Sequence, residues 1–501
     1  MVPMRGRQTW MLQPLPGRAI AVLLLTVSIL TAAPALTPTP LDIGSRKQLF
    51  IDHRFIVRSE HVTLRTNPAE KLGLIRDEHD QPWPGSDHLS RVLEDGEKVK
   101  LYLGADSLTV LESEDGIHFH RTGDIIRGGV FTTIFLDPHD TPERRYKVFW
   151  IQGFGPQYRE TDGIYAGYSA DGLHFTPVGR VLPLINDNPP LVHWDARIGK
   201  YVIYTRALEQ NSENQRRIGR IETDDVLKPW PHNDVPPGPG HRITPRDIPV
   251  VLQADAQDDP FSDIYYNSSV IYPWAQDVYL MFTAQFRHFS PQRQPFVKPH
   301  VPGQWEDFGL LEVQLAASRD GIHWERPSRE PYFPTGLADE WDRWYAVMAP
   351  GMVRRGNYLY QYYYSSGRTH DSAFVRAEYE HSAPRMGGIG VVRQRLDGFV
   401  SADADYRGGW LETPPVVFRG NRLRLNVDTG AMGTAFVELR DAAGKPLPGY
   451  VLQDCEEVGG NYIEQVVYWK GKPDVSTLAG KPVRLYFKLT RAKLYAFQFA
   501  D

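Results

Sequence analysis

Cysteine is almost missing from this sequence of 501 residues. The chain has one cysteine, Cys455, and this residue has no partner for an internal disulfide. A chain with so few thiols is compatible with export from the cytoplasm. At this length the chain can bury a large hydrophobic core and form two domains.

An excess of positive charge is missing as well. Lys and Arg number 56 and Asp and Glu number 61, which gives a formal net charge of −5. No basic run is long enough to follow a phosphate backbone, which nucleic-acid-binding proteins usually contact through a basic patch. We therefore expect no nucleic acid among the partners.

Long apolar runs are absent beyond the N-terminus. There, three arginines precede an apolar run over residues 19–30, and Ala33-Pro34-Ala35 supplies small residues at cleavage-site spacing. The run is short for a membrane span, and no cysteine follows it to carry a lipid anchor. We expect a signal peptide over residues 1–35 and a secreted or periplasmic protein, with no stable membrane span after signal removal. An uncleaved N-terminal anchor is the alternative.

What the sequence does contain is self-similarity. A tyrosine-centred apolar strand recurs at Leu101-Tyr102-Leu103, Arg145-Tyr146-Lys147-Val148, Lys200-Tyr201-Val202-Ile203, Val278-Tyr279-Leu280-Met281 and Tyr358-Leu359-Tyr360. A second phrase, Ser-x-Asp-Gly-x-His followed by Phe or Trp, recurs at residues 113–119, 169–175 and 318–324. Repetition over tens of residues indicates a repeat architecture. We interpret the Asp-Gly pairs as turns and the trailing aromatic residue as packing between repeats.

The repeats predict an all-β chain with almost no helix. Each repeat begins with an apolar strand, turns through Asp, Gly or Pro, and returns in the tyrosine-centred strand, which is typical of a hairpin. Five such units predict a five-bladed β-propeller over residues 36–396, with an N-terminal segment that wraps the ring or closes its last blade. A composition shift near Leu396 and alternating short strands from Trp410 onward, one of them over 465–469, predict a β-sandwich accessory domain over residues 397–501.

A functional site is expected on one face of the ring. Because the strands of a blade are antiparallel, the start of the first, the end of the second and the start of the third share one face. Inner-strand starts supply Asp87, His88, Asp187, Asp263, Asn267 and Asp342. Second-strand ends supply Asp106, Arg206, Arg287, His288, Arg368 and His370, and the third strand of the fourth blade begins near Glu312. The turn residues Asp137 and Asp195 are expected on the opposite face.

Carboxylates gathered around an axis suit glycoside hydrolysis. That reaction needs one carboxyl group to protonate the leaving oxygen and another to activate water or attack the sugar. We predict Asp87 as base or nucleophile, Asp187 as acid and Asp263 as a catalytic residue that orients substrate. The predicted substrate-binding residues are His88, Arg206, Asn267, Arg287, His288, Glu312, Asp342, Arg368 and His370.

Structural roles are the alternative for each of these residues taken singly. An acid can be solvated or salt-bridged, and each histidine can be a hydrogen-bonded scaffold residue. The arginines can bind hydroxyls or a carboxylate of the substrate. No tight spacing of metal ligands is present, so we predict no metal and no cofactor.

The chain resembles the five-bladed propeller glycosidases, which include fructosidases and arabinanases or xylosidases (glycoside hydrolase families 32 and 43). The resemblance covers roughly residues 45–395 and is closest to uncharacterised secreted bacterial family 32-like proteins. These share phrases such as Leu49-Phe50-Ile51-Asp52, Arg385-Met386-Gly387-Gly388-Ile389-Gly390 and Leu396-Asp397-Gly398-Phe399-Val400.

The chain departs from the fructosidase motifs. It has Trp83-Pro84-Gly85-Ser86-Asp87 where they have Trp-Met-Asn-Asp-Pro-Asn-Gly, and Leu136-Asp137-Pro138 where they have Arg-Asp-Pro. Their Glu-Cys acid motif has no counterpart. The resemblance therefore implies the fold, and it does not imply fructose chemistry.

Three functions are compatible with these observations. We expect a secreted glycoside hydrolase that cleaves a poly- or oligosaccharide with paired carboxylates in the axial pocket. The missing family motifs favour a second hypothesis, that the chain is a non-catalytic carbohydrate-binding propeller. A lyase or metal-assisted enzyme that uses the histidine-rich face is the third.

Overall fold

The fold is all-β in a computed structural model. The model describes residues 39–83, 89–104, 107–126, 130–153, 159–183, 188–208, 216–232, 248–288, 309–337, 339–367, 369–370 and 387–501. Within these ranges there is no α-helix, and the helical turns are the short 3-10 segments His53–Phe55, Pro142–Arg144 and Ser476–Leu478. The prediction of an almost helix-free chain is confirmed for these residues.

The predicted signal peptide over residues 1–35 lies outside the described residues. In the part of the chain that the structure describes, no helix has the length and apolar character needed to cross a bilayer.

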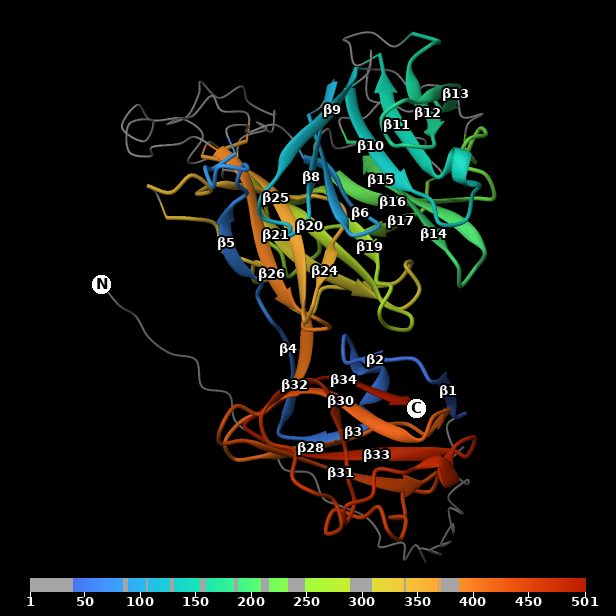
Figure 1. The fold of residues 1–501 in the computed structure, drawn as a ribbon, viewed down its shortest axis with the longest axis vertical. Helices are drawn as coiled ribbons and strands as arrows, with labels where there is room; N and C mark the ends of the chain where they lie inside the picture. The colour runs from blue at the N-terminus through green and yellow to red at the C-terminus, as the bar shows by residue number, and fades with distance from the viewer. Residues whose placement is uncertain are drawn as a thin grey trace, which may run out of the picture. The chain divides into compact units, whose positions relative to one another are not determined.

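Three sheets are four-stranded antiparallel meanders, in which strands that are neighbours in the chain are hydrogen-bonded (Figure 1). The first meander consists of β6 (Leu89–Asp95), β7 (Lys98–Leu103), β8 (Ser107–Ser113) and β9 (His120–Ile126). The second consists of β10 (Val130–Leu136), β11 (Tyr146–Gln152), β12 (Gly163–Ser169) and β13 (Thr176–Leu182). The third consists of β14 (Leu191–Asp195), β15 (Lys200–Leu208), β16 (Arg216–Thr223) and β17 (Val250–Leu252).

A ten-stranded sheet contains two further meanders, joined by a parallel bridge between Leu311 and Tyr345. The fourth meander consists of β18 (Ser262–Tyr266), β19 (Ser269–Ile271), β20 (Tyr279–His288), β21 (Gly309–Ser318) and β22 (Trp324–Glu325). The fifth consists of β23 (Tyr345–Met348), β24 (Val353–Arg355), β25 (Tyr358–Ser366), β26 (Gly387–Arg395) and the N-terminal strand β5 (Glu70–Leu74). Because β5 pairs with β26, the N-terminal segment completes the last meander.

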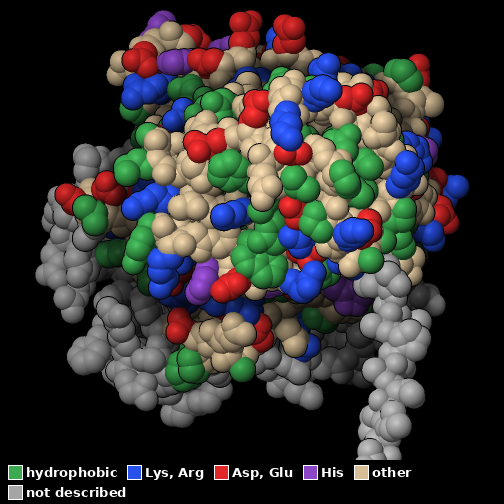
Figure 2. Space-filling view, turned by 90° about the horizontal axis from the view of Figure 1, so that it is seen from below, with side chains coloured by type: hydrophobic (Ala, Val, Ile, Leu, Met, Phe, Trp, Pro, Cys, Tyr) green, Lys and Arg blue, Asp and Glu red, His purple; other side chains and the backbone are tan. Residues whose placement is uncertain are grey.

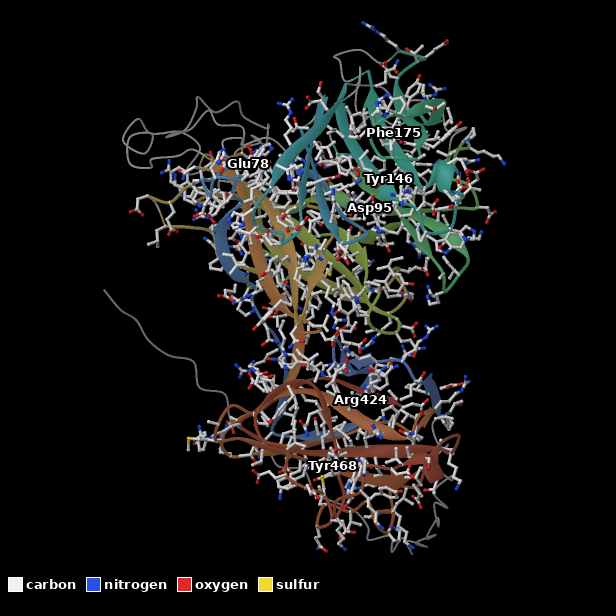
Figure 3. All side chains as sticks on the ribbon, viewed as in Figure 1. Glu78, Asp95, Tyr146, Phe175, Arg424 and Tyr468 are labelled. Atoms are coloured by element: carbon white, nitrogen blue, oxygen red, sulfur yellow. The ribbon has the colours of Figure 1, made fainter. Side chains whose placement is uncertain are left out.

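Three of the five recurring tyrosines bind a turn aspartate of the preceding meander. Tyr146 donates its hydroxyl hydrogen to Asp95, and the two residues lie together in Figure 3. Tyr201 donates to Asp137 at 2.8 Å, and Asp137 also accepts the backbone N–H of His139 at 2.9 Å. Asp195 holds its turn in the same way and accepts from Tyr279 at 2.7 Å. These contacts explain the tyrosine at three of its five positions, and they confirm the turn role of Asp137 and Asp195.

The Ser-x-Asp-Gly phrase forms a turn that packs against another meander. Asp115 accepts the backbone N–H groups of Ile117 and His118, both at 2.8 Å, and Gly116 has a φ of +82°. The carbonyl of Gly116 accepts the hydroxyl hydrogen of Tyr362, in the fifth meander, at 2.7 Å. Phe119 then packs edge-on against the Tyr362 ring, with centroids 5.8 Å apart. Both the turn and the packing between meanders are as predicted here, and the contact joins the first meander to the fifth.

Two six-stranded sheets complete the fold. The first contains β1 (Leu41–Gly44), β3 (Arg58–Glu60), β28 (Gly409–Glu412), β29 (Val416–Phe418), β31 (Thr434–Asp441) and β33 (Val483–Thr490). The second contains β2 (Gln48–Leu49), β4 (Val62–Thr66), β27 (Val400–Ala404), β30 (Arg422–Asp428), β32 (Asn461–Val466) and β34 (Ala492–Ala500). Phe50, Phe487 and Phe497 meet in a core that both sheets share. The N-terminal segment is thus divided, since β1 to β4 join these sheets.

Asp397 ties the two groups of sheets together. Its buried carboxylate pairs with Lys47 at 2.8 Å and accepts hydrogen bonds from Tyr272 and Asn426, at 2.7 and 3.0 Å. Tyr272 follows β19 in the fourth meander, and Asn426 lies on β30. On the face seen in Figure 2, acidic and basic side chains are interspersed and no large patch of one sign is visible.

Candidate functional site

The start of β18, the end of β20 and the start of β16 meet at one buried carboxylate. Asp263 is 2% exposed, and its Oδ2 accepts hydrogen bonds from Nη1 and the backbone N–H of Arg216, at 3.1 and 3.3 Å. Nε2 of His288 lies 3.3 Å from the same oxygen. A carboxylate this enclosed is suited to fix Arg216 and His288, since each buried charge or dipole needs a partner.

The carbonyl of Tyr265 is a second point of convergence. It accepts a hydrogen bond from Nη2 of Arg206 and another, at 2.9 Å, from Nδ2 of Asn188. The guanidinium groups of Arg206 and Arg216 lie 4.5 and 5.1 Å from the centre of the Tyr265 ring, in cation–π contact. The cluster therefore joins residues of the third and fourth meanders.

Burial changes the protonation equilibrium of Arg206. Loss of water contact, followed by the nearby charge of Arg216, lowers the pKa of Arg206 to about 10. The side chain still carries its charge at neutral pH. It therefore remains able to bind an oxygen ligand by charge-assisted hydrogen bonds.

Aromatic rings border the arginines. The His370 ring lies 4.8 Å from that of Tyr265 and 4.9 Å from that of Phe286, and it is nearly parallel to Tyr345 at 6.2 Å. Tyr265 and His370 are partly exposed, whereas Phe286 is fully buried. Flat partly exposed rings beside hydrogen-bond donors are a suitable surface for a sugar, which has apolar faces and polar edges.

The other predicted residues in the described ranges lie in separate environments. Arg287 pairs with Glu312 at 3.1 Å and with Asp259 at 3.3 Å. Asn267 is buried in the gap between β18 and β19, and its Oδ1 has no hydrogen-bond partner among the described residues. Asp342, which is 1% exposed, binds Tyr363 at 2.8 Å and Lys71 at 2.7 Å, toward the outer strands of its meander.

Among the described carboxyl groups, Glu312 has an environment that favours its neutral form. Burial raises the pKa of Glu312, and the charge of Arg287 only partly opposes this effect. A raised pKa is the direction of shift that a general acid requires.

Several predicted site residues lie outside the described residues. They are Asp87, His88, Asp106, Asp187 and Arg368. Their neighbours in the chain are described. Leu89 begins β6 directly after His88, and Asn188, which follows Asp187, is bonded to Tyr265.

The structure brings four predicted residues together, directly or through shared partners: Asp263, His288, Arg206 and His370. Sequence reasoning missed Arg216 and Arg91. Arg216 begins a third strand, so the rule that selected Glu312 would also have selected Arg216. Arg91 lies inside a predicted inner strand. A charged residue at a position expected to be buried was the feature of the sequence that could have identified it.

A surface pocket lies away from this cluster. It is lined by Ile51, Asp52, Ala317, Ser318, Arg319, Asp320, His323 and Glu325. Arg319 already pairs with Asp52 at 2.9 Å, and His323 with Asp320 at 2.7 Å. Within the described ranges, no three His, Cys, Asp or Glu side chains are grouped so as to hold a metal ion. We therefore take the Asp263 cluster as the candidate site.

Neither a family model nor a curated protein sequence matches this chain. Among solved structures it is similar to one titled "Glycoside hydrolase", with a TM-score of 0.42 and 14% identity over 66% of this chain and 93% of the other. A family 43 arabinoxylan arabinofuranohydrolase from Bacillus subtilis has a TM-score of 0.35 and 12% identity over 83% and 96%. An N-acetylgalactosamine deacetylase from F. plautii has a TM-score of 0.37 and 12% identity over 72% and 96%. Because these titles name different reactions, the function has to be argued from the residues of this chain.

Proposed function

We propose that the five meanders form the blades of a five-bladed β-propeller of the family 32-like type, and that the two six-stranded sheets form an accessory β-sandwich. The support lies in the contacts between meanders. Asp95, Asp137 and Asp195 each bind a tyrosine of the next meander, and the Gly116–Tyr362 bond joins the first meander to the fifth. The N-terminal sequence supports secretion.

We infer that this propeller is a glycoside hydrolase acting on a poly- or oligosaccharide. The observation that carries the proposal is the bond from Asn188 to the carbonyl of Tyr265, which Arg206 also binds. Asp187 directly precedes Asn188, so an acidic residue adjoins a position that is anchored beside two buried arginines and a partly exposed aromatic wall. Such a wall with convergent polar groups is typical of carbohydrate and other small-molecule sites.

In this proposal Asp187 protonates the glycosidic oxygen, and Asp87 activates water or attacks the anomeric carbon. Arg206 binds substrate oxygens, and His370 and Tyr265 contact the sugar ring. Asp263 orients substrate through Arg216, because its own carboxylate is enclosed. Glu312, with its raised pKa, is a further candidate for holding a proton.

The experiment is a turnover assay on a panel of plant and algal polysaccharides and oligosaccharides, with release of reducing ends as the readout. The wild type should release product from at least one of them, and Asp187→Asn and Asp87→Asn should each lose at least about a hundredfold in kcat. Asp224→Asn, which removes an 84% exposed carboxylate, is the matched control and should keep full activity. Full activity in Asp187→Asn would reject its role as acid.

A non-catalytic carbohydrate-binding propeller is the second candidate. It is favoured by the enclosure of Asp263, the one predicted catalytic acid among the described residues, whose Oδ2 is held by Arg216 and His288. Under this alternative, glycan binding measured by calorimetry occurs without turnover in the wild type. In that case Asp187→Asn changes only affinity.

A further inference from the structure

Arg91, in the inner strand β6, is a buried cation. The residue is 7% exposed, and its Nε and Nη1 atoms are enclosed with no hydrogen-bond partner in the described residues. Arginine keeps its charge at any physiological pH. Burying such a charge without a negative partner is costly, and buried polar atoms without partners are rare in folded proteins. The environment of Arg91 therefore calls for a compensating anion.

The described carboxylates do not supply it. Burial lowers the pKa of Arg91 to about 10, and the group that opposes this effect is the hydroxyl of Tyr266. Two other enclosed arginines have acidic partners, Asp263 for Arg216 and Asp258 for Arg326. Arg91 thus differs from them in the one feature that normally makes a buried arginine stable.

The residues around Arg91 come from several meanders. The charge of Arg91 acts on His193, on β14, and on Tyr266, on β18, so its side chain lies near the inner strands of the third and fourth meanders. His193 is bonded to Ser269 at 2.9 Å and has a pKa of about 3, which leaves it neutral. It adds no positive charge and no negative charge to the site.

Strand β10, which packs against β6, adds hydroxyl groups. Thr132 and Thr133 are buried, and the Oγ1 atoms of both have no hydrogen-bond partner among the described residues. A hydroxyl can donate to an anion as well as accept from a donor. One fixed positive charge without an acidic partner among the described residues matches a monovalent anion in charge.

We propose that Arg91 binds a chloride ion enclosed between the inner strands of the meanders. The ion neutralises the guanidinium and serves as a fixed part of the folded structure. The chloride proposal does not depend on the proposed hydrolase activity. If an experiment overturns one of the two proposals, the other is unaffected.

The first test measures thermal unfolding of the full chain as chloride replaces gluconate at constant ionic strength. A ligand that binds only the folded state raises Tm in a saturable way, here by about 2 °C or more. Bromide should act like chloride. Arg91→Met should lose this dependence, and Arg319→Met, which removes an arginine paired with Asp52, should keep it. A chloride response that persists in Arg91→Met would overturn the proposal.

The second test needs no variant, so it decides the question if Arg91→Met does not fold. Crystals of the wild type soaked in bromide are examined by anomalous scattering. The proposal expects a bromide peak within hydrogen-bond distance of Nε or Nη1 of Arg91. A water molecule or a protein carboxylate at that position, with no bromide, would refute it.

Discussion

Nη1 of Arg216 lies 3.1 Å from Oδ2 of Asp263, and the two side chains are 1% and 3% exposed. The pair joins the first residue of β16 to β18, and His288 adds the end of β20. Three strand ends are thereby held beside Arg206 and Tyr265. Because both charges are removed from water, each depends on the other for its stability in the folded state.

Substituting Asp263 by Asn should destabilise the chain. The variant keeps the size of the side chain and removes the charge that Arg216 needs, at a cost of roughly 3 kcal/mol in the free energy of unfolding. Chemical denaturation measures this cost. Asp224→Asn, which alters an exposed aspartate, should leave the midpoint unchanged. An unchanged midpoint in Asp263→Asn would show that the pair does not support the site.

The raised pKa of Glu312 predicts a pH dependence of stability. The folded state disfavours the charged form, so the contribution of this group is fully present below the unfolded pKa, near 4.5, and is lost as pH rises through the folded pKa. As pH rises from about 4 to about 7, the free energy of unfolding of Glu312→Gln should therefore increase relative to that of the wild type. Urea unfolding at both pH values measures the difference. A relative gain by the wild type would mean that pairing with Arg287 outweighs burial.

The packing of the Ser-x-Asp-Gly turns can be separated from their backbone conformation. Gly321 has a φ of +73°, and an added Cβ would lie 2.6 Å from the hydroxyl of Tyr204. Gly199 has a φ of +65° with no atom within 4 Å of the added Cβ. Gly199→Ala should cost about 1 kcal/mol, and Gly321→Ala roughly 2–4 kcal/mol. Equal costs in denaturant unfolding would show that the contact between meanders contributes nothing.

The sequence predicted what is set by local chemistry. Asp-Gly turns and tyrosine-centred strands are encoded by residues close together in the sequence. The turn at Gly116 and the hairpin that contains Tyr201 could therefore be predicted. One strand was misplaced: β32 covers Asn461–Val466, whereas the alternation of short strands and turns predicted a strand over 465–469. Trp469 instead lies in a turn closed by Lys472, with its indole N–H bonded to Val437.

Long-range pairing could not be predicted. The partners of β1 to β4 come from beyond residue 399, and no local pattern encodes that choice. The direction in which a side chain points at the start of a strand could not be predicted from the sequence either. Asp342 and Asp263 occupy similar sequence positions, but Asp342 binds Lys71 and Tyr363, and Asp263 binds Arg216.

The proposal that two carboxylates perform hydrolysis is tested most directly by a crystal structure that locates Asp87 and Asp187. The proposal predicts that their carboxyl groups face each other across the site at about 5–10 Å, the span that covers retaining and inverting hydrolysis. A separation greater than about 12 Å, beyond the reach of either reaction course, would contradict it.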